Sequence, residues 1–393
     1  MIDSRRRFHF SNGMDDLVDM KWTVIDWDTR RWLQLIGPSE LLGGDDIEAY
    51  RQIAARFADQ LGPDQHTIVV DKNGALEKFT REDITMEVRY PKYTGPMDKN
   101  QVIRRSELTE LDRINICTDL VEYNSSDGET TGERLVFKYT IIDDILLNLW
   151  QNLHILKGLQ GNDLFVPFHR IVIDDVNETI LGFTSIYMSG GTLKDYRGTF
   201  YFRWLKQITD AIDQLNLRYG ILHQDLAPRN ILIDPTTHDL KVFDFDMSAK
   251  MDGQNGLTTS IDVNSVIITV YEALTGDEQF VRIPPWERDT SNIEKMEEWS
   301  LQLPLEDGFD ISDYRKYLSE WAAVRRTTKT IKHSSEATEP LSIPEYPKLV
   351  PYQPRNEFRN FDVYTRSRAE AEEAGDYVTR WERPAQHELT TSN

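Results

Sequence analysis

The sequence predicts an α+β protein in which a small antiparallel sheet precedes a mainly helical part, with a further α+β segment ahead of both. Two patterns predict this fold class. Between residues 116 and 188, short runs of β-branched and aromatic residues alternate with turn residues, which is typical of strands. After residue 200, apolar residues recur at helical spacing. We therefore divide the chain into residues 1–105, 110–188, 189–326 and 327–393.

Composition narrows the class of protein and its surroundings. The chain has 393 residues, of which 39% are hydrophobic and 10% aromatic, enough to bury a substantial core. Its formal charge of -21 repels a phosphate backbone, so we expect no nucleic-acid partner. No run approaches the roughly 18 apolar residues of a membrane span, so we expect no membrane partner either. A single cysteine, Cys117, and the absence of an apolar stretch after the basic N-terminus predict a cytoplasmic protein.

The first part of the chain contains short helical and strand patterns but no recognisable chemical motif. Residues 46–61 have the spacing of an amphipathic helix. Residues 116–123 and 134–139 are predicted strands of a hairpin around the polar loop 124–132. The predicted order then continues with a helix and two strands, at 142–159, 165–173 and 180–188.

The second part is predicted to be mainly helical. Amphipathic or apolar helices are expected at 200–219, 262–275 and 312–326. Beyond residue 327 the composition turns polar and then proline-rich. We expect this tail to wrap the domain or to stay partly disordered, with one short helix near Glu370.

The most informative segment spans residues 220–234. It reads His-Gln-Asp-Leu-Ala-Pro-Arg-Asn from His223 to Asn230, and a hydrophobic strand then ends in Asp244, fourteen residues after Asn230. This order and spacing resemble the catalytic loop and metal-binding motif of protein kinases. The chain is thereby identified as a member of the protein-kinase-like superfamily over roughly residues 110–325, most similar to divergent kinase-like proteins of filamentous fungi. The resemblance implies a two-lobed fold with a sheet-rich N-lobe and a helical C-lobe.

The resemblance also implies an activity, namely ATP- and Mg²⁺-dependent transfer of a phosphoryl group to a protein hydroxyl. Such transfer needs positioning and charge neutralisation more than covalent help. Asn230 and Asp244 offer the oxygen atoms that Mg²⁺ prefers. Asp225 is expected to accept or orient the proton of the attacking hydroxyl. The alternative for Asp225 is a carboxylate that only caps its loop.

Further residues are expected to bind the nucleotide. Lys138 lies inside an apolar strand, where an ammonium needs a negative partner, and it resembles the phosphate-contacting lysine of the family. The alternative is an edge-strand lysine that faces water. Residues 184–193 resemble the hinge, so Ile186 and Met188 are expected to offer backbone groups to adenine. Leu232 is expected to lie beneath the adenine ring.

The catalytic loop carries three further expectations. Arg229 is placed to reach the transferring phosphate, as its counterpart does in tyrosine-type loops. Gln224 replaces the arginine that reads activation-loop phosphorylation in many kinases, so we expect no control by that route. Asp262 resembles the buried aspartate that holds the loop backbone, and its alternative is an N-terminal helix cap. His223 and Phe245 are expected to be packing residues.

Departures from the family pattern leave two alternatives open. Loop 124–132 lacks the Gly-x-Gly-x-x-Gly sequence that wraps phosphates. The helix after Lys138 contains no glutamate, and Asn152 is the best match for that position. These two departures favour a pseudokinase, a nucleotide-binding scaffold. Asp246 in place of the usual glycine and the 18-position step from Asp244 to Asp262 favour a small-molecule kinase of the aminoglycoside or choline kinase type.

Overall fold

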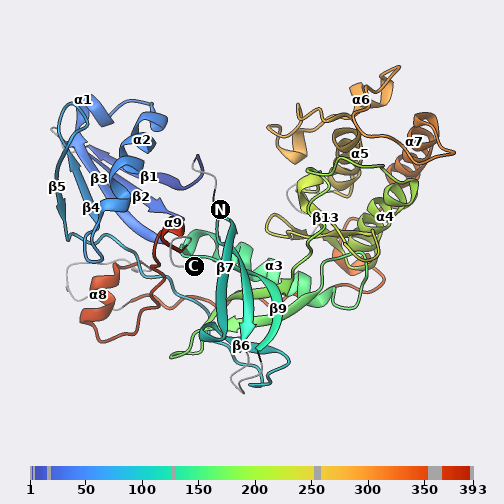
Figure 1. The fold of residues 1–393 in the computed structure, drawn as a ribbon. Helices are drawn as coiled ribbons and strands as arrows, with labels where there is room; N and C mark the ends of the chain where they lie inside the picture. The colour runs from blue at the N-terminus through green and yellow to red at the C-terminus, as the bar shows by residue number, and fades with distance from the viewer. Residues whose placement is uncertain are drawn as a thin grey trace. The chain divides into compact units, whose positions relative to one another are not determined.

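The computed structural model describes residue 2 and residues 5–15, 19–124, 130–251, 258–352 and 365–389. It contains two compact units, and each is described by itself (Figure 1). Unit 1 combines parts of three segments that the sequence suggested separately, namely the N-terminal segment, the sheet and the tail. The four segment boundaries taken from the sequence stay predictions. Unit 1 comprises residues 1–146, 171–183 and 346–393, and unit 2 comprises residues 147–170 and 184–345.

The N-terminal part of unit 1 is a five-stranded sheet in the order β1-β2-β3-β4-β5. Neighbouring strands are antiparallel except β3 and β4, and the parallel pair requires a crossover, which α2 supplies. Tyr50 and Ile53 of α2 pack with Leu33 and Leu35 of β3 in one hydrophobic core. The helix predicted at residues 46–61 is thereby confirmed. The elements are β1 (Phe8–Asp15), β2 (Asp19–Asp26), β3 (Arg31–Pro38), α1 (Ser39–Leu42), α2 (Ile47–Phe57), η1 (Ala58–Gln60), β4 (Thr67–Val70) and β5 (Leu76–Thr80).

A second sheet has six strands in the order β6-β10-β11-β9-β8-β7. It confirms the four predicted strands and adds two, β6 and β7. Strand β6 pairs in parallel with β10, so the expectation of a purely antiparallel sheet is wrong. At Gly182 a Cβ atom would lie 2.1 Å from the carbonyl oxygen of Lys138, so only glycine lets β11 approach there. Residues 125–129 of the predicted hairpin loop lie outside the described residues. The strands are β6 (Val102–Arg104), β7 (Leu108–Asn115), β8 (Thr118–Asn124), β9 (Thr130–Tyr139), β10 (Phe168–Ile173) and β11 (Ile180–Ile186).

The C-terminal tail is part of the core of unit 1. The Trp381 side chain is 5% exposed, and its ring stacks on Tyr139 of β9 with centroids 4.9 Å apart. The guanidinium of Arg105 lies 4.2 Å from the same ring, and the Trp381 Nε1 donates to the Tyr90 hydroxyl at 2.8 Å. Residues 365–389 therefore wrap onto this unit, and the helix predicted near Glu370 is α8 (Arg368–Glu373), followed by α9 (Gln386–Leu389).

Buried charges reinforce this attachment. Asp119 of β8 is 1% exposed and accepts hydrogen bonds from Arg30, in the turn after β2, and from Arg383 of the tail, the latter at 2.9 Å. Arg113 of β7 donates to the Asp28 carboxylate at 2.6 Å. A buried charge is tolerated only when it is paired, so these contacts join the first sheet, the second sheet and the tail.

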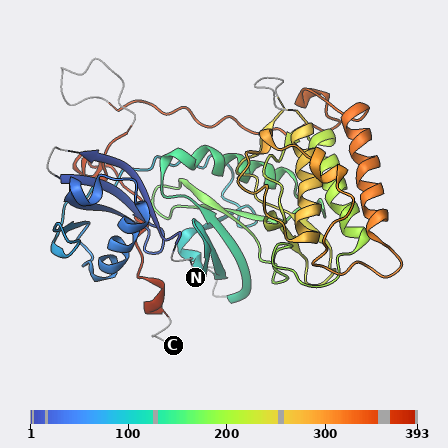
Figure 2. The same cartoon turned by 90° about the horizontal axis from the view of Figure 1, so that it is seen from above.

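Unit 2 is mainly helical, as predicted. Helices α4, α5 and α7 contact one another, and Figure 2 shows them side by side. The apolar helix α5 is buried on nearly all sides. Among the described residues, none of the helices has both the length and the apolar character for a bilayer crossing. The helices are α3 (Leu146–Gly158), α4 (Phe202–Asp213) with a π-helical turn (Gln214–Arg218), η5 (Pro228–Asn230), α5 (Ser260–Thr275), η6 (Pro285–Glu287), α6 (Ser291–Lys295), α7 (Ile311–Thr327) and η7 (Ser334–Glu336). The short helices η2 (Arg105–Glu107) and η3 (Asp143–Ile145) belong to unit 1.

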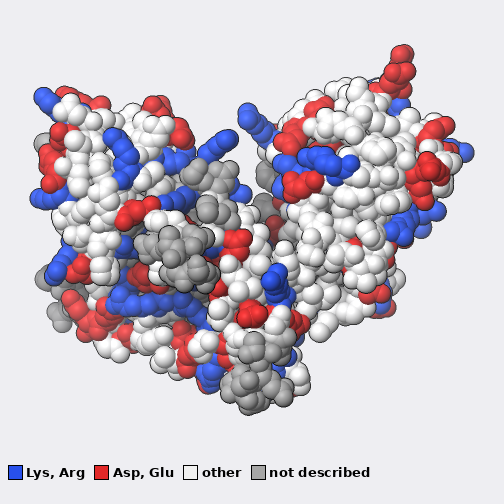
Figure 3. Space-filling view, in the orientation of Figure 1, with Lys and Arg blue, Asp and Glu red and all other residues white. Residues whose placement is uncertain are grey.

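Two short strand pairs frame the loops of unit 2. β12 (Ile221–Leu222) pairs with β15 (Ala249–Lys250), and β13 (Ile231–Ile233) pairs with β14 (Leu240–Val242), both antiparallel. Residues 220–234, which carry the resemblance to kinase loops, therefore run from β12 through η5 into β13. On the visible face of each unit, acidic and basic side chains are interspersed (Figure 3).

We expect Trp381→Ala to lower the free energy of unfolding of unit 1 by about 3–5 kcal/mol, because it removes a buried ring that stacks on Tyr139. Calorimetry of the full chain would record this as a lower midpoint of one transition. Trp286→Ala is the matched control, since this side chain in unit 2 is 59% exposed. Equal stability losses in the two variants would contradict the packing role of Trp381.

Candidate functional site

The backbone of the loop that carries Asp225 is held by a buried carboxylate. Asp262, in the first turn of α5, is 0% exposed. Its Oδ2 accepts from the His223 amide at 2.8 Å and from Asn216 Nδ2 at 2.7 Å, and its Oδ1 accepts from the Gln224 amide at 2.9 Å. The N-cap of α5 is Thr259, not Asp262. The loop-holding role expected for Asp262 is therefore supported over the helix-cap alternative.

Gln224 connects this loop to the segment after Asp244. Its φ is +63°, a left-handed conformation that a residue other than glycine keeps only when its surroundings enforce it. Asp262 binds its amide, and its own Nε2 donates to the Met247 carbonyl at 2.9 Å. Many kinases have an arginine at this position. Here the glutamine side chain instead makes a direct hydrogen bond to the backbone of the segment after Asp244.

Asp225 is oriented by two side chains of its own loop. The turn η5 brings Arg229 and Asn230 back toward it, with the Asn230 amide donating to the Ala227 carbonyl at 2.9 Å. Arg229 donates to Asp225 Oδ1 at 2.5 Å, and Asn230 Nδ2 donates to Oδ2 at 3.0 Å. The Asp225 side chain keeps 24% exposure, so the carboxylate remains within reach of a ligand.

The two residues expected to hold the metal lie at one end of the β13–β14 hairpin. The Phe243 amide donates to the Asn230 carbonyl at 3.1 Å, which places Asp244 one residue from this contact. Because Asn230 Nδ2 is used by Asp225, its Oδ1 is the side-chain atom suited to a cation. The described residues contain no group of three or more His, Cys, Asp or Glu arranged for a metal. A pair of oxygen ligands fits Mg²⁺, which commonly takes one or two carboxylates plus substrate phosphates.

The segment expected to bind adenine packs on β13. The Leu193 amide donates to the Ile231 carbonyl at 2.8 Å, and Thr192 lies opposite Leu232. A Cβ at Gly190 would lie 2.0 Å from the Ile233 carbonyl oxygen, so this close approach requires glycine.

The backbone amide of Ile186 is bonded within unit 2. It donates to the Pro167 carbonyl at 3.1 Å, and the predicted contact of Ile186 with adenine stays a prediction. Met188, two residues on, is 8% exposed. Ile186, Met188 and Leu232 therefore all belong to unit 2, on the hinge segment and the strand that it contacts.

Lys138 is a residue of the second sheet. It lies on β9 opposite Thr118 of β8, half-buried, on the face away from buried Phe137 and Tyr139. Lys138 belongs to unit 1, whereas Asp225 and the metal-binding pair belong to unit 2. Its contact with ATP phosphates stays a prediction.

Asn152 of α3 has a partner within unit 2. It is 2% exposed, and its Nδ2 donates to Asp246 Oδ1 at 2.7 Å. The sequence singled out both residues as departures from the family pattern but did not connect them. Their hydrogen bond joins α3 to the segment directly after Asp244.

Sequence reasoning missed Glu272 of α5 and Arg288. Each is 7% exposed. Burial raises the pKa of Glu272, and the positive charges of Arg229, Lys194 and Arg288 oppose that shift. A glutamate that follows the apolar run 266–268 and 270–271 at helical spacing was the available signal, because acidic residues are seldom buried without a reason.

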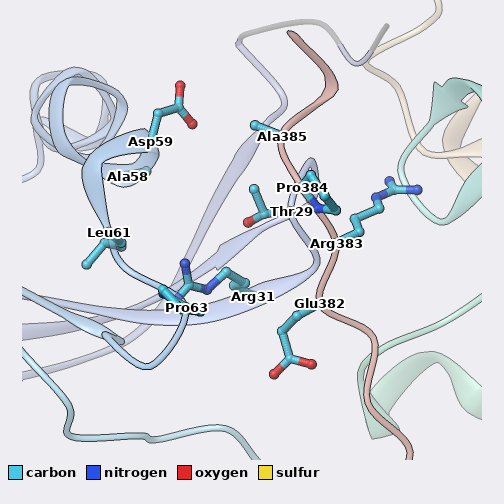
Figure 4. Close-up of a pocket in the computed structure, with 10 residues that line it drawn as sticks. All are labelled: Thr29, Arg31, Ala58, Asp59, Leu61, Pro63, Glu382, Arg383, Pro384 and Ala385. Atoms are coloured by element: carbon cyan, nitrogen blue, oxygen red, sulfur yellow. The ribbon is translucent and has the colours of Figure 1, made fainter. Parts of the chain in front are cut away.

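One pocket belongs to unit 1. It has a volume of about 350 Å³ and is formed in unit 1 by the region after α2 and the tail, as Figure 4 shows. The Arg31 guanidinium at its wall donates to the carbonyls of Gly62, at 3.0 Å, and Gln65. Because the Arg31 guanidinium is already hydrogen-bonded to these carbonyls, the pocket does not support a further ligand-binding site built on Arg31.

Comparison with known proteins matches part of the chain. A family model described as protein kinase domain matches residues 148–260, which include Asp225, Asn230 and Asp244 and begin after Lys138. CBL-interacting serine/threonine-protein kinase 21 of Arabidopsis thaliana is 27% identical over 145 residues, 35% of this chain and 33% of the relative. CBL-interacting serine/threonine-protein kinase 20 of the same plant is 28% identical over 174 residues, 41% of this chain and 38% of the relative. The chain thus spans little more than a third of the length of these curated relatives.

We expect Asp262→Asn to lower the free energy of unfolding of unit 2 by about 1–3 kcal/mol, since an amide cannot accept from all three buried donors. Denaturation in urea measures this loss, and hydrogen exchange of the His223 and Gln224 amides should accelerate. Asp195→Asn, an exposed position in the same unit, serves as the control. Unchanged exchange at both amides would show that Asp262 does not hold the loop.

Proposed function

Because this chain belongs to the protein-kinase-like superfamily, we propose that it transfers the γ-phosphate of ATP to a protein hydroxyl in an Mg²⁺-dependent reaction. The observation that carries the proposal is the arrangement around Asp225, whose two oxygens are oriented by Arg229 and Asn230 on a loop anchored by Asp262. Phosphoryl transfer depends mainly on such positioning. The description of both relatives as serine/threonine-protein kinases supports a protein hydroxyl as the acceptor.

The chemical roles follow from the atoms present. The acceptor hydroxyl gives its proton to Asp225 as its oxygen bonds to the γ-phosphorus, while the bond from that phosphorus to the bridging oxygen breaks and ADP leaves. Asn230 Oδ1 and the Asp244 carboxylate would hold Mg²⁺, which when bound neutralises phosphate charge.

The nucleotide is proposed to lie against the hinge segment. The Ile186 carbonyl and the Met188 backbone would contact adenine, with Leu232 beneath the ring. Lys138 would contact the phosphates. Arg229 is proposed to approach the transferring phosphate once it leaves Asp225.

A nucleotide-binding pseudokinase is the second candidate. The hydrogen bond from Asn152 to Asp246 favours it, because the position expected to supply an acidic partner for Lys138 carries a neutral amide that is already in use. The small-molecule kinase alternative stays a prediction, supported by the short step from Asp244 to Asp262.

We also infer a cytoplasmic location and no nucleic-acid partner. Cys117 is 6% exposed, and burial raises the pKa of its thiol to about 12, so it remains protonated and unreactive. A lone unreactive thiol and the charge of -21 support these two inferences. The resemblance to fungal proteins stays a prediction.

We expect Asp225→Asn to reduce phosphate transfer by about 100-fold or more, since the amide cannot take up the hydroxyl proton. Radiolabelled ATP with Mg²⁺ and either the protein alone or a cell extract provides the measurement. Label incorporation that is equal in the wild type and the variant would exclude catalysis at Asp225 and favour the scaffold.

Nucleotide binding is tested separately by thermal unfolding. At about 100 times the dissociation constant, ATP with Mg²⁺ should stabilise the wild type by about 2.7 kcal/mol. We expect Asp244→Asn, or removal of Mg²⁺ by a chelator, to abolish the Mg²⁺-dependent part of this shift. Asp289→Asn, an exposed carboxylate in unit 2, should keep it. A full shift in Asp244→Asn would remove this residue from the metal site.

A further inference from the structure

Arg325 is a buried cation for which the proposed function has no role. It lies in the last turn of α7, and its side chain is 0% exposed. Burying a guanidinium is unfavourable unless acceptors surround it, because the charge loses its contact with water. The acceptors that Arg325 binds therefore indicate what this end of α7 holds in place.

The Arg325 guanidinium contacts acceptors on two other parts of unit 2. Its Nη2 donates to Asn216 Oδ1, in the π-helical turn after α4, at 2.7 Å. Its Nε forms an ion pair with Asp213 Oδ1, at the end of α4, at 3.0 Å. Its Nη1 donates to the Lys329 carbonyl just after α7. Arg325 thus joins α7 to the end of α4 and to the turn that follows.

Asn216 continues this chain of contacts to Asp262. Its side chain is 0% exposed, and its Nδ2 donates to Asp262 Oδ2 at 2.7 Å and to the Ile221 carbonyl at 2.8 Å. A side-chain amide carries its acceptor and its donor on separate atoms, whereas arginine has donors only. Arg325 can therefore bind only the Oδ1 end of Asn216, and this contact keeps the Nδ2 end directed at Asp262.

The chain of contacts ends at the loop that carries Asp225. Asp262 accepts from Asn216 and from the amides of His223 and Gln224, and Asp225 is the next residue. Without Arg325, Asn216 Oδ1 would be buried without its charged donor, and a buried acceptor in that state is costly. The Asn216 amide would then be less firmly held against Asp262.

We propose that Arg325 is a positioning residue for Asp225, which acts through Asn216 and Asp262 to hold the backbone of the catalytic loop. Helix α7 lies outside residues 148–260, the span matched by the kinase family model, so this support comes from beyond the matched span. The inference rests on the proposed function for its catalytic meaning. The hold on the loop itself can be measured without catalysis.

Hydrogen exchange of the full chain tests this hold. Arg325→Met removes every donor and keeps a long side chain, so the His223 and Gln224 amides should exchange about 10-fold faster than in the wild type. The Gln302 amide, which donates to the Leu274 carbonyl at 2.7 Å, reports general opening of unit 2 and should change less. Wild-type exchange at both loop amides in Arg325→Met would overturn the inference.

Arg315→Met is the matched control on the same helix. Arg315 donates to the Glu297 carbonyl at 2.8 Å, so this variant removes an arginine of α7 without removing the contact to Asn216. Its loop amides should exchange as in the wild type. Acceleration equal to that in Arg325→Met would show a general effect of α7 and would overturn the inference.

Arg325→Lys separates positioning from charge pairing. The lysine keeps a charge for Asp213 but brings one nitrogen where the guanidinium brings three. We expect the loop amides to stay fast, and this milder variant also decides the question if Arg325→Met does not fold. Recovery of wild-type exchange in Arg325→Lys would mean that the charge alone suffices, which contradicts a role through the Asn216 amide.

A double-mutant cycle identifies the route. Asn216→Leu interrupts the chain of contacts, so exchange of the Gln224 amide should accelerate, and Arg325→Met should add little in that background. Additive effects of the two substitutions would show that Arg325 does not act through Asn216, and the proposal would fail.

Kinetic measurements separate this inference from the function on which it rests. Arg325→Met should lower kcat about 10-fold at unchanged KM for ATP, because the loop is displaced while the hinge segment is not. Arg315→Met should keep the wild-type kcat. A wild type that shows no Asp225-dependent phosphate transfer would reject the proposed function, while hydrogen exchange would still decide whether Arg325 holds the loop.

Discussion

The candidate site depends on the burial of one carboxylate, that of Asp262. Its desolvation is compensated by donors from Asn216, His223 and Gln224, so movement of the loop would leave a negative charge buried without partners. This constraint holds Gln224 in a left-handed conformation that it would otherwise leave. Asp225 is the next residue in the chain. Its position is therefore set by the buried Asp262 of α5 instead of by the exposed part of the loop. The precision that the proposed phosphoryl transfer requires would thus originate in the buried start of α5.

Unit 1 also depends on a buried carboxylate whose charge is compensated by donors. Asp119 is buried and satisfied by Arg30 and Arg383, which lie 89 and 264 positions away in the chain. Stacking of Trp381 on Tyr139 adds apolar contact to the same region. The tail and the N-terminal sheet are thereby fastened to β8 and β9, the latter being the strand that carries Lys138. The tail and the N-terminal sheet contain no recognisable motif. They nevertheless pack against the strands that hold Lys138, which is expected to bind nucleotide.

The sequence predicted what is encoded locally. Helical spacing located α2, α4, α5 and α7, and the run from His223 to Asn230 identified the loop whose atoms the structure arranges around Asp225. What the sequence did not predict are contacts between residues far apart in the chain. The parallel edge strand β6, the docking of Trp381 and the Asn152–Asp246 hydrogen bond join residues far apart in the chain, and periodicity carries no information on such pairs. The hydrogen bond from the Ile186 amide to the Pro167 carbonyl depends on the direction of the backbone, and side-chain patterns do not predict that direction.

Asn230 explains how the proposed proton-accepting and metal-binding parts of the site can lie close together. A side-chain amide carries its donor and its acceptor on separate atoms, and here Nδ2 donates to Asp225 while Oδ1 remains suited to a cation. An aspartate at this position would offer two acceptors, lose the hydrogen bond and place a second negative charge about 3 Å from the Asp225 carboxylate. Like charges at that separation repel each other, so the Asp225 carboxylate would lose the orientation that the amide gives it. The neutral amide therefore lets the two proposed parts of the site share a residue without placing a second charge beside Asp225.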